Sequence, residues 1–243
     1  LLRRFPMPLF ALTFVYLMIL MLSTLLPLVG SVAPMLLTPL FAIGMMHAIR
    51  SADRDQAPTL RMLFAGFSDA GGKAWPPLLL LGLMNVASTI AALALAALAD
   101  GGTLMRVATG AASATDPALR ETSIVWAALA FLLLYTPVQA ALWYAPMFVA
   151  WHRITPLKAM FFSLIAVLRN KGAFLAYLLT WFVIALVASL AVQALKFLLG
   201  SSPVLVSLLL SPLSLLVLTA LYCSFWPTYR DAVRDGQDEL PAV

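Results

Sequence analysis

Apolar segments of about twenty residues are the feature that most limits what this chain can fold into. A helix needs roughly 20 apolar residues to cross a bilayer core about 30 Å thick. Only 10% of the 243 residues are charged, against roughly 25% in a soluble domain. We therefore expect the lipid bilayer to cover much of the chain. Six segments meet or approach the required length, and we expect each to be a transmembrane helix: residues 9–29, 32–49, 76–98, 123–150, 173–199 and 203–226.

Short connections join the expected spans in pairs. Residues 30–31 link the first two spans, and residues 200–202 link the last two. Residues 99–122, which are rich in Gly, Ala, Ser and Thr, are expected to form a flexible loop between spans three and four. The sequence thus predicts one all-α domain over residues 1–243, a polytopic membrane bundle of six transmembrane helices arranged as three helical hairpins.

The first apolar run could in principle be a secretory signal. The chain starts at Leu1 rather than at Met, so we expect a native stretch to precede it. The run over residues 9–29 is longer than the usual 7–15-residue core of a signal peptide, and no small-residue cleavage site stands out. We interpret this run as a true span.

Basic residues segregate to alternate loops, which predicts the orientation of the spans. Cytoplasmic loops are enriched in Lys and Arg. Three basic residues fall on one side, Arg106, Arg120 and Lys196. The other twelve fall on the opposite, predicted cytoplasmic side: Arg3, Arg4, Arg50, Arg54, Arg61, Lys73, Arg153, Lys158, Arg169, Lys171, Arg230 and Arg234. Both termini are then cytoplasmic. We assign the net charge of +5 to contact with anionic lipid headgroups, with no nucleic-acid partner.

Two cytoplasmic segments show the spacing of amphipathic helices, approximately residues 58–70 and 156–169. Apolar residues recur at i, i+3, i+4 and i+7, namely Leu60, Leu63, Phe64 and Phe67 in the first and Leu157, Met160, Phe161, Leu164 and Leu168 in the second. We expect both helices to lie along the inner membrane surface or to pack under the bundle. The second segment could also be a re-entrant stretch or the start of span five.

A proline with a preceding hydroxyl residue recurs in spans two, four and six, at Thr38-Pro39, Thr136-Pro137 and Ser211-Pro212. Pro39 and Pro137 are 98 residues apart, and so are the prolines that start the two amphipathic segments. The sequence predicts three related hairpins. Pro39, Pro137 and Pro212 are candidate helix bends, because proline frees a backbone carbonyl. The alternative is that prolines are simply common in membrane helices.

The hairpin arrangement, together with the segments Pro156-Leu157-Lys158-Ala159-Met160-Phe161-Phe162-Ser163 and Arg169-Asn170-Lys171, resembles an uncharacterised family of proteobacterial six-helix inner-membrane proteins. The resemblance covers most of the chain, and its motifs are architectural rather than chemical. It implies a multi-pass protein of the bacterial inner (cytoplasmic) membrane. It implies no activity.

Residues that could perform catalysis are few. His47 and His152 lie near the cytoplasmic ends of even-numbered spans, and no acidic or cysteine-rich cluster accompanies them. All ten acidic residues fall in predicted loops or the tail, although ion-coupled carriers often hold an ionisable residue at membrane depth. No phosphate-binding glycine loop, zinc motif or nucleophile elbow is present. We expect no enzymatic activity, no cofactor and no metal.

Polar side chains within the spans include Asn85, Gln139 and Gln193. They could form interhelical hydrogen bonds, which we favour, or line a narrow polar path. We expect a protein that acts by binding, as an accessory, assembly or membrane-organising subunit with a membrane-protein partner. The alternative is a small transporter or channel for a neutral or amphiphilic, lipid-like solute. An enzyme would need a site shared by His47 and His152.

Overall fold

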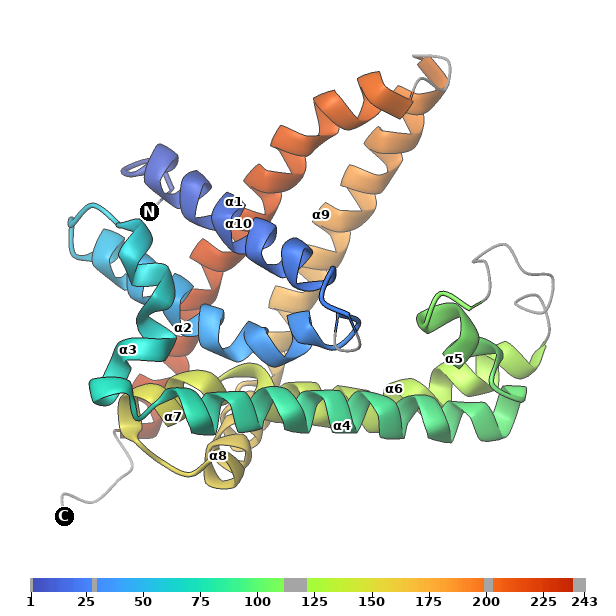
Figure 1. Cartoon of the computed structure of the whole chain (residues 1–243), viewed down its shortest axis with the longest axis horizontal. Coiled ribbons are helices and arrows are strands. Elements are labelled where there is room, and N and C mark those ends of the chain that lie inside the picture. Colours follow the sequence, from blue (N-terminus) through green and yellow to red (C-terminus); the bar gives the residue numbers. More distant parts are fainter. Residues whose placement is uncertain (1, 28–29, 112–121, 199–202, 238–243) are drawn as a thin grey trace. The chain divides into compact units, whose positions relative to one another are not determined.

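The computed structural model describes residues 2–27, 30–111, 122–198 and 203–237, and within these ranges every regular element is a helix (Figure 1). The all-helical fold class expected from the sequence is therefore confirmed. The elements in chain order are α1 (Pro6–Ser23), α2 (Ala33–Asp53), the 3-10 helix η1 (Leu60–Phe64), α3 (Ala65–Gly72), α4 (Trp75–Asp100), α5 (Thr103–Ala108), α6 (Thr122–Trp143), α7 (Ala145–His152), α8 (Pro156–Arg169), α9 (Lys171–Leu198) and α10 (Pro203–Gln237).

Several of these helices suit a membrane. Among the described residues, five segments are long and apolar enough to cross a bilayer: Pro6–Ser23, Ala33–Asp53, Trp75–Asp100, Ile124–His152 and Lys171–Phe197. The fourth of these covers both α6 and α7. The sixth predicted span, residues 203–226, lies in α10. The side chains of residues 203–210 fall outside the described part of the chain, so the count of six spans stays a prediction.

Two helix ends differ from the predicted span ends. α1 ends at Ser23, before the predicted limit of 29. The Ser23 hydroxyl donates to the Leu20 carbonyl at 2.7 Å, and residues after it form turns. The connection to α2 is therefore longer than the predicted pair of residues. α10 continues beyond residue 226, through Pro227, to Gln237.

The predicted flexible loop over residues 99–122 contains the short helix α5 in its first half. Asp100 lies before this helix, and its carboxylate accepts hydrogen bonds from the backbone N–H groups of Gly102, the N-cap residue, at 2.8 Å and Leu104 at 2.7 Å. These bonds pair N–H groups at the start of α5 that have no partner within the helix. The expectation of a loop without structure was wrong for residues 103–108. Residues 112–121 lie outside the described part.

The helix boundaries agree with a repeat of 98 residues. α4 ends at Asp100 and α9 ends at Leu198, which are 98 residues apart. Asp55 and Arg153, also 98 residues apart, are the non-glycine residues with positive φ in the described chain, at 59° and 56°. Each follows the end of a helix, α2 or α7. The first two predicted hairpins therefore end their second span with the same left-handed turn.

Contacts group the chain into two compact units. Unit one contains Leu1–Met18, Gly44–Phe64 and Ala166–Val243, and unit two contains Ile19–Ile43 and Ala65–Ile165. In unit two, α4 and α6 run antiparallel and side by side, with α5 at one end of the pair and α7 at the other (Figure 1). In unit one, α9 and α10 form a hairpin.

Glycines permit close backbone contacts within each unit. In unit one, a Cβ on Gly44 would lie 2.0 Å from the Leu63 carbonyl oxygen. In unit two, a Cβ on Gly82 would lie 2.5 Å from the Leu36 carbonyl oxygen. Both distances are far below van der Waals contact, so only glycine fits at these two positions in α2 and α4.

Candidate functional site

A pocket of about 230 Å³ lies in unit two, where α4 begins and α7 ends. Two basic residues and five apolar residues line it, namely Lys73, Ala74, Pro77, Val149, Ala150, Arg153 and Ile154. We call this the Lys73–Arg153 pocket. Ala74, Val149 and Ala150 are buried, whereas both basic side chains are exposed. The lining thus combines apolar side chains with two cationic ones.

Backbone turns place the two cations. Lys73 lies in the turn between α3 and α4, directly after Gly72, whose φ of 78° suits glycine. Arg153 ends α7 in the left-handed conformation, with φ 56° and ψ 30°. That conformation costs a non-glycine residue roughly 1–2 kcal/mol. The chain therefore holds an arginine where glycine is the usual residue at a helix end.

No carboxylate in the described part of the chain forms an ion pair with Lys73 or Arg153. The start of α4 adds a partial positive charge, because helix dipoles point their positive end at the N-terminus. α4 has no side-chain cap there, and prolines follow Trp75 at positions 76 and 77. Since proline has no N–H group, the donors at this site come mainly from the two basic side chains.

Helix α8 is attached to the other helices of unit two through Ser163. The Ser163 hydroxyl accepts a hydrogen bond from the Tyr144 N–H and donates one to the Ala140 carbonyl, both at 2.9 Å. These two backbone groups are four residues apart and would pair with each other in an unbroken helix. The hydroxyl is inserted between them, and Pro146 at the start of α7 has no N–H group to pair with the Leu142 carbonyl. The helix is interrupted at Tyr144, between α6 and α7.

The outer side of α8 carries the apolar residues that the sequence spacing picked out. Ala159 and Ser163 are fully buried, at 0% exposure. Leu157, Phe161 and Leu168 are exposed by 70%, 60% and 58%. The helix therefore packs through its small residues and presents its large apolar residues outward.

The prolines proposed as bends lie inside continuous helices. Pro39 is within α2, Pro137 within α6 and Pro212 within α10. The interruption of the fourth candidate span falls at Tyr144, seven residues after Pro137. The role of the three prolines as functional bends stays a prediction.

Two of the predicted polar residues meet. Gln139 Nε2 donates a hydrogen bond to Asn85 Oδ1 at 2.8 Å, which links α6 to α4. Neither residue lines the Lys73–Arg153 pocket. Gln193 lies in α9 of unit one, where its side chain is exposed and has no hydrogen-bond partner in the described part of the chain. The Asn85–Gln139 pair has the form of an interhelical contact.

The two histidines belong to different units, His47 to unit one and His152 to unit two. Among the described residues, no group of three or more His, Cys, Asp and Glu side chains is placed to hold a metal ion.

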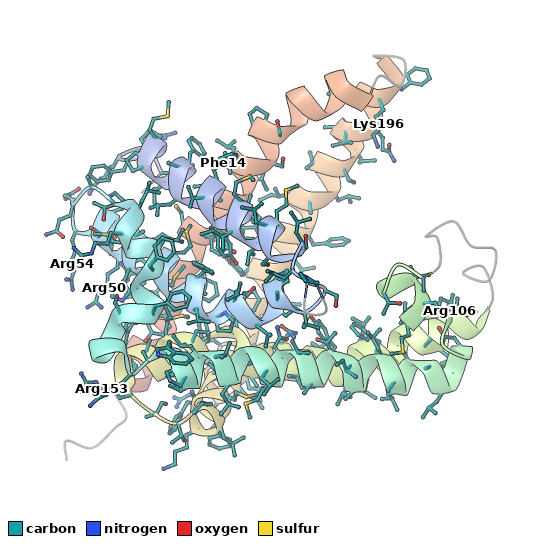
Figure 2. The ribbon with its side chains drawn as sticks, viewed as in Figure 1. Phe14, Arg50, Arg54, Arg106, Arg153 and Lys196 are labelled. Carbon is teal, nitrogen blue, oxygen red and sulfur yellow. The ribbon has the colours of Figure 1, made fainter. Side chains whose placement is uncertain are left out.

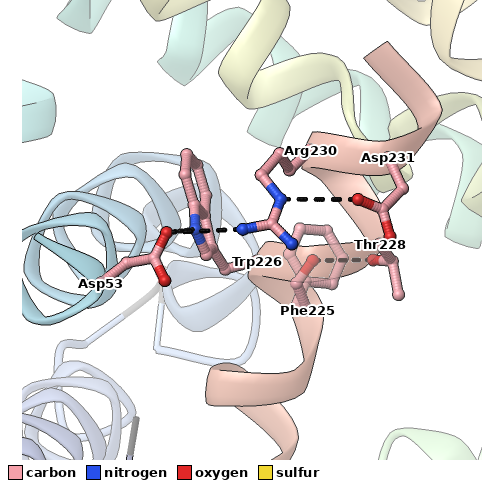
Figure 3. Close-up of polar contacts among 6 residues, drawn as sticks. All are labelled: Asp53, Phe225, Trp226, Thr228, Arg230 and Asp231. Atoms are coloured by element: carbon pink, nitrogen blue, oxygen red, sulfur yellow. Dashed lines mark hydrogen bonds and ion pairs between the residues drawn. The ribbon is translucent and has the colours of Figure 1, made fainter. Parts of the chain in front are cut away.

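A polar cluster that sequence reasoning missed ties α10 to α2 in unit one (Figure 3). Trp226 Nε1 donates to Asp53 Oδ2 at 3.0 Å, and Arg230 lies 3.6 Å from the same carboxylate oxygen. Burial raises the pKa of Tyr229, which follows on the same helix, and the charge of nearby Arg50 opposes that shift. The sequence signal was the placement of Trp226 at the end of the sixth predicted span, residues 203–226.

Basic side chains lie at opposite ends of the α4–α6 pair. Figure 2 shows Arg153 near the end where α4 starts and Arg106, in α5, near the other end. The loop charges predicted these two residues to lie on opposite sides of the membrane. The side of the membrane on which each residue lies stays a prediction.

Comparison with known proteins places the chain in a family. No family profile matches it, and no solved structure matches it. A probable inner membrane protein of Burkholderia thailandensis strain E264 is 40% identical over 246 residues, a match that covers 98% of this chain and 90% of the relative. The expected resemblance to an uncharacterised inner-membrane family is confirmed, and this helical chain belongs to the same family as that probable inner membrane protein.

Proposed function

We propose that the chain is a multi-pass inner-membrane protein that acts by binding a second membrane protein, as an accessory, assembly or membrane-organising subunit. In this proposal it has six spans and cytoplasmic termini, and α8 lies at the inner membrane surface as an amphipathic helix. The exposed apolar residues of α8 support an interfacial location, because such a helix needs a large apolar side toward lipid.

The observation that carries the proposal is the surface of α9. None of its most apolar 18-residue window is buried. Ala185, Ser189 and Gln193 follow one another at intervals of four residues, and all three are exposed. Small residues at this spacing let membrane helices approach closely, and an amide side chain can hydrogen-bond across the contact. Gln193 is exposed and has no hydrogen-bond partner among the described residues. A free amide is unfavourable in lipid, and in this proposal a helix of another protein supplies its partner.

Native extraction of the tagged full chain tests this proposal. Mass spectrometry of everything that stays bound should find a stoichiometric protein partner. Gln193→Leu should reduce recovery of that partner. Thr180→Val is the matched control, because the exposed Thr180 hydroxyl donates to the Ala176 carbonyl of its own helix at 2.8 Å. A protein that is alone and monodisperse in native membranes would refute the proposal.

A second candidate function is transport of a neutral or amphiphilic solute. The interruption of the fourth candidate span at Tyr144 favours it, because interrupted helices form the substrate sites of many transporters. Proteoliposomes containing the purified chain should then move a fluorescent phospholipid between leaflets faster than empty liposomes. Equal rates in the two preparations would exclude lipid as the solute.

A further inference from the structure

We propose that the Lys73–Arg153 pocket binds the phosphate group of an anionic phospholipid from the cytoplasmic leaflet. The inference rests on the proposed membrane orientation, in which both basic residues lie on the cytoplasmic side. It deepens the proposed function by naming a lipid site on the subunit.

The charge at the pocket favours an anion. Lys73 and Arg153 come from different segments and converge on one cavity, without an acidic partner among the described residues. A phosphate group in this pocket would be attracted by both cations. Arginine can also bind phosphate through two parallel N–H donors.

The apolar lining favours a lipid over a free anion. Ala74, Pro77, Val149, Ala150 and Ile154 offer no polar side chain to a solvated inorganic ion, and they complement the glycerol and first acyl carbons of a phospholipid. The volume of about 230 Å³ is below the roughly 300–1,000 Å³ of pockets that enclose drug-sized ligands. The pocket is therefore large enough for a headgroup phosphate and too small for a whole lipid, whose chains would remain in the bilayer.

The internal repeat allows the turn at Arg153 to be compared with an equivalent turn in the first repeat. The equivalent position in the first repeat is Asp55, which has the same left-handed backbone and pairs with Arg4. Aspartate is one of the side chains that tolerate this conformation. In the second repeat the same turn carries a cation with no carboxylate partner in the described chain, and it faces a cavity instead of an ion pair.

The test uses the purified full chain in detergent and native mass spectrometry. The probes are phosphatidylglycerol and phosphatidylcholine with the same acyl chains, with and without excess inorganic phosphate. The wild-type chain should retain phosphatidylglycerol in preference to phosphatidylcholine. Lys73→Gln and Arg153→Gly should each reduce that retention by about fivefold. This factor corresponds to the attraction of about 1 kcal/mol between one basic residue and anionic lipid. The double variant should lose the preference.

Controls separate lipid binding from folding. Arg153→Gly places glycine where the backbone favours it, so this variant should be at least as thermally stable as the wild type. Lys158→Gln removes an exposed positive charge of α8 that is outside the pocket lining, and it should leave retention unchanged. Asp55→Gly makes the equivalent turn change at a residue outside the pocket lining and should also leave retention unchanged.

Three results would overturn the proposal. One is equal phosphatidylglycerol retention by the wild type and the double variant. Another is a loss in Lys158→Gln as large as in the pocket variants, which would indicate a diffuse charge effect. The third is complete release of the lipid by inorganic phosphate, which would indicate a site for the free anion. A wild-type chain that shows no preference for phosphatidylglycerol but keeps its protein partner would refute this site alone, whereas absence of any partner would refute the proposed function alone.

Discussion

Replacing Ser163 with alanine tests the interruption between α6 and α7. The substitution removes an oxygen that accepts the Tyr144 N–H and donates to the Ala140 carbonyl, each at 2.9 Å, at a fully buried position. A buried donor left without an acceptor costs about 1–3 kcal/mol. Direct pairing of Tyr144 with Ala140 would recover part of that cost, but it would require α6 and α7 to join and α8 to shift.

We therefore expect Ser163→Ala to lower the free energy of unfolding by about 2 kcal/mol, a factor of roughly 30 in the folding equilibrium. The assay is reversible unfolding in mixed micelles followed by circular dichroism, with hydrogen exchange measured at the Tyr144 amide. Ser189→Ala is the matched control, because the exposed Ser189 hydroxyl bonds only to the Leu186 carbonyl of its own helix in the described chain. It should change stability by less than about 0.5 kcal/mol.

Equal stability of the two variants, together with unchanged exchange at Tyr144, would refute the inserted-hydroxyl account. Such a result would mean that the interruption is maintained by other packing and that α8 is not fastened there by Ser163.

Two further substitutions test the packing of the helices. Gly44→Ala should destabilise the chain by about 1–3 kcal/mol, because its Cβ would lie 2.0 Å from the Leu63 carbonyl oxygen. Gly172→Ala in α9 should instead stabilise the chain by up to about 1 kcal/mol, because a Cβ there would meet no atom of a neighbouring segment within 4 Å. The same unfolding assay compares the two variants. Asn85→Leu and Gln139→Leu should show a coupling of about 0.6 kcal/mol in a double-mutant cycle, and strictly additive effects would show that their hydrogen bond contributes nothing.

Sequence patterns predicted the helices well where an apolar run or a regular apolar spacing lies within a single helix. The apolar run over residues 76–98 lies within α4, and the spacing over residues 156–169 coincides with α8. The offset of 98 residues also recurs in the helix ends. Hydropathy locates apolar segments rather than helix ends. It therefore did not predict that α10 continues past Trp226 into polar sequence, or that α1 ends before its apolar run does.

The features that sequence reasoning missed depend on approach between distant segments. Ser163 looks like an ordinary small polar residue until α8 brings it against Tyr144, 19 residues away. Asp53 and Trp226 are 173 residues apart, and no periodicity relates them. The pocket likewise needs Lys73 from the turn before α4 and Arg153 from the turn after α7. The Asn85–Gln139 bond could be anticipated, since polar groups in membrane helices usually find each other.

Membrane topology is the measurement that tests the central claim most directly. Cysteines would replace Arg106 in α5 and Lys158 in α8, in a background in which Cys223 is changed to alanine, and intact cells would be labelled with a maleimide that cannot cross the inner membrane. Both residues are exposed in the structure. An inner-membrane protein with a cytoplasmic Lys73–Arg153 pocket should be labelled at position 106 in intact cells and at position 158 only after permeabilisation. Labelling of both positions from the outside, or of position 158 alone, would contradict the proposed orientation and the lipid site that depends on it.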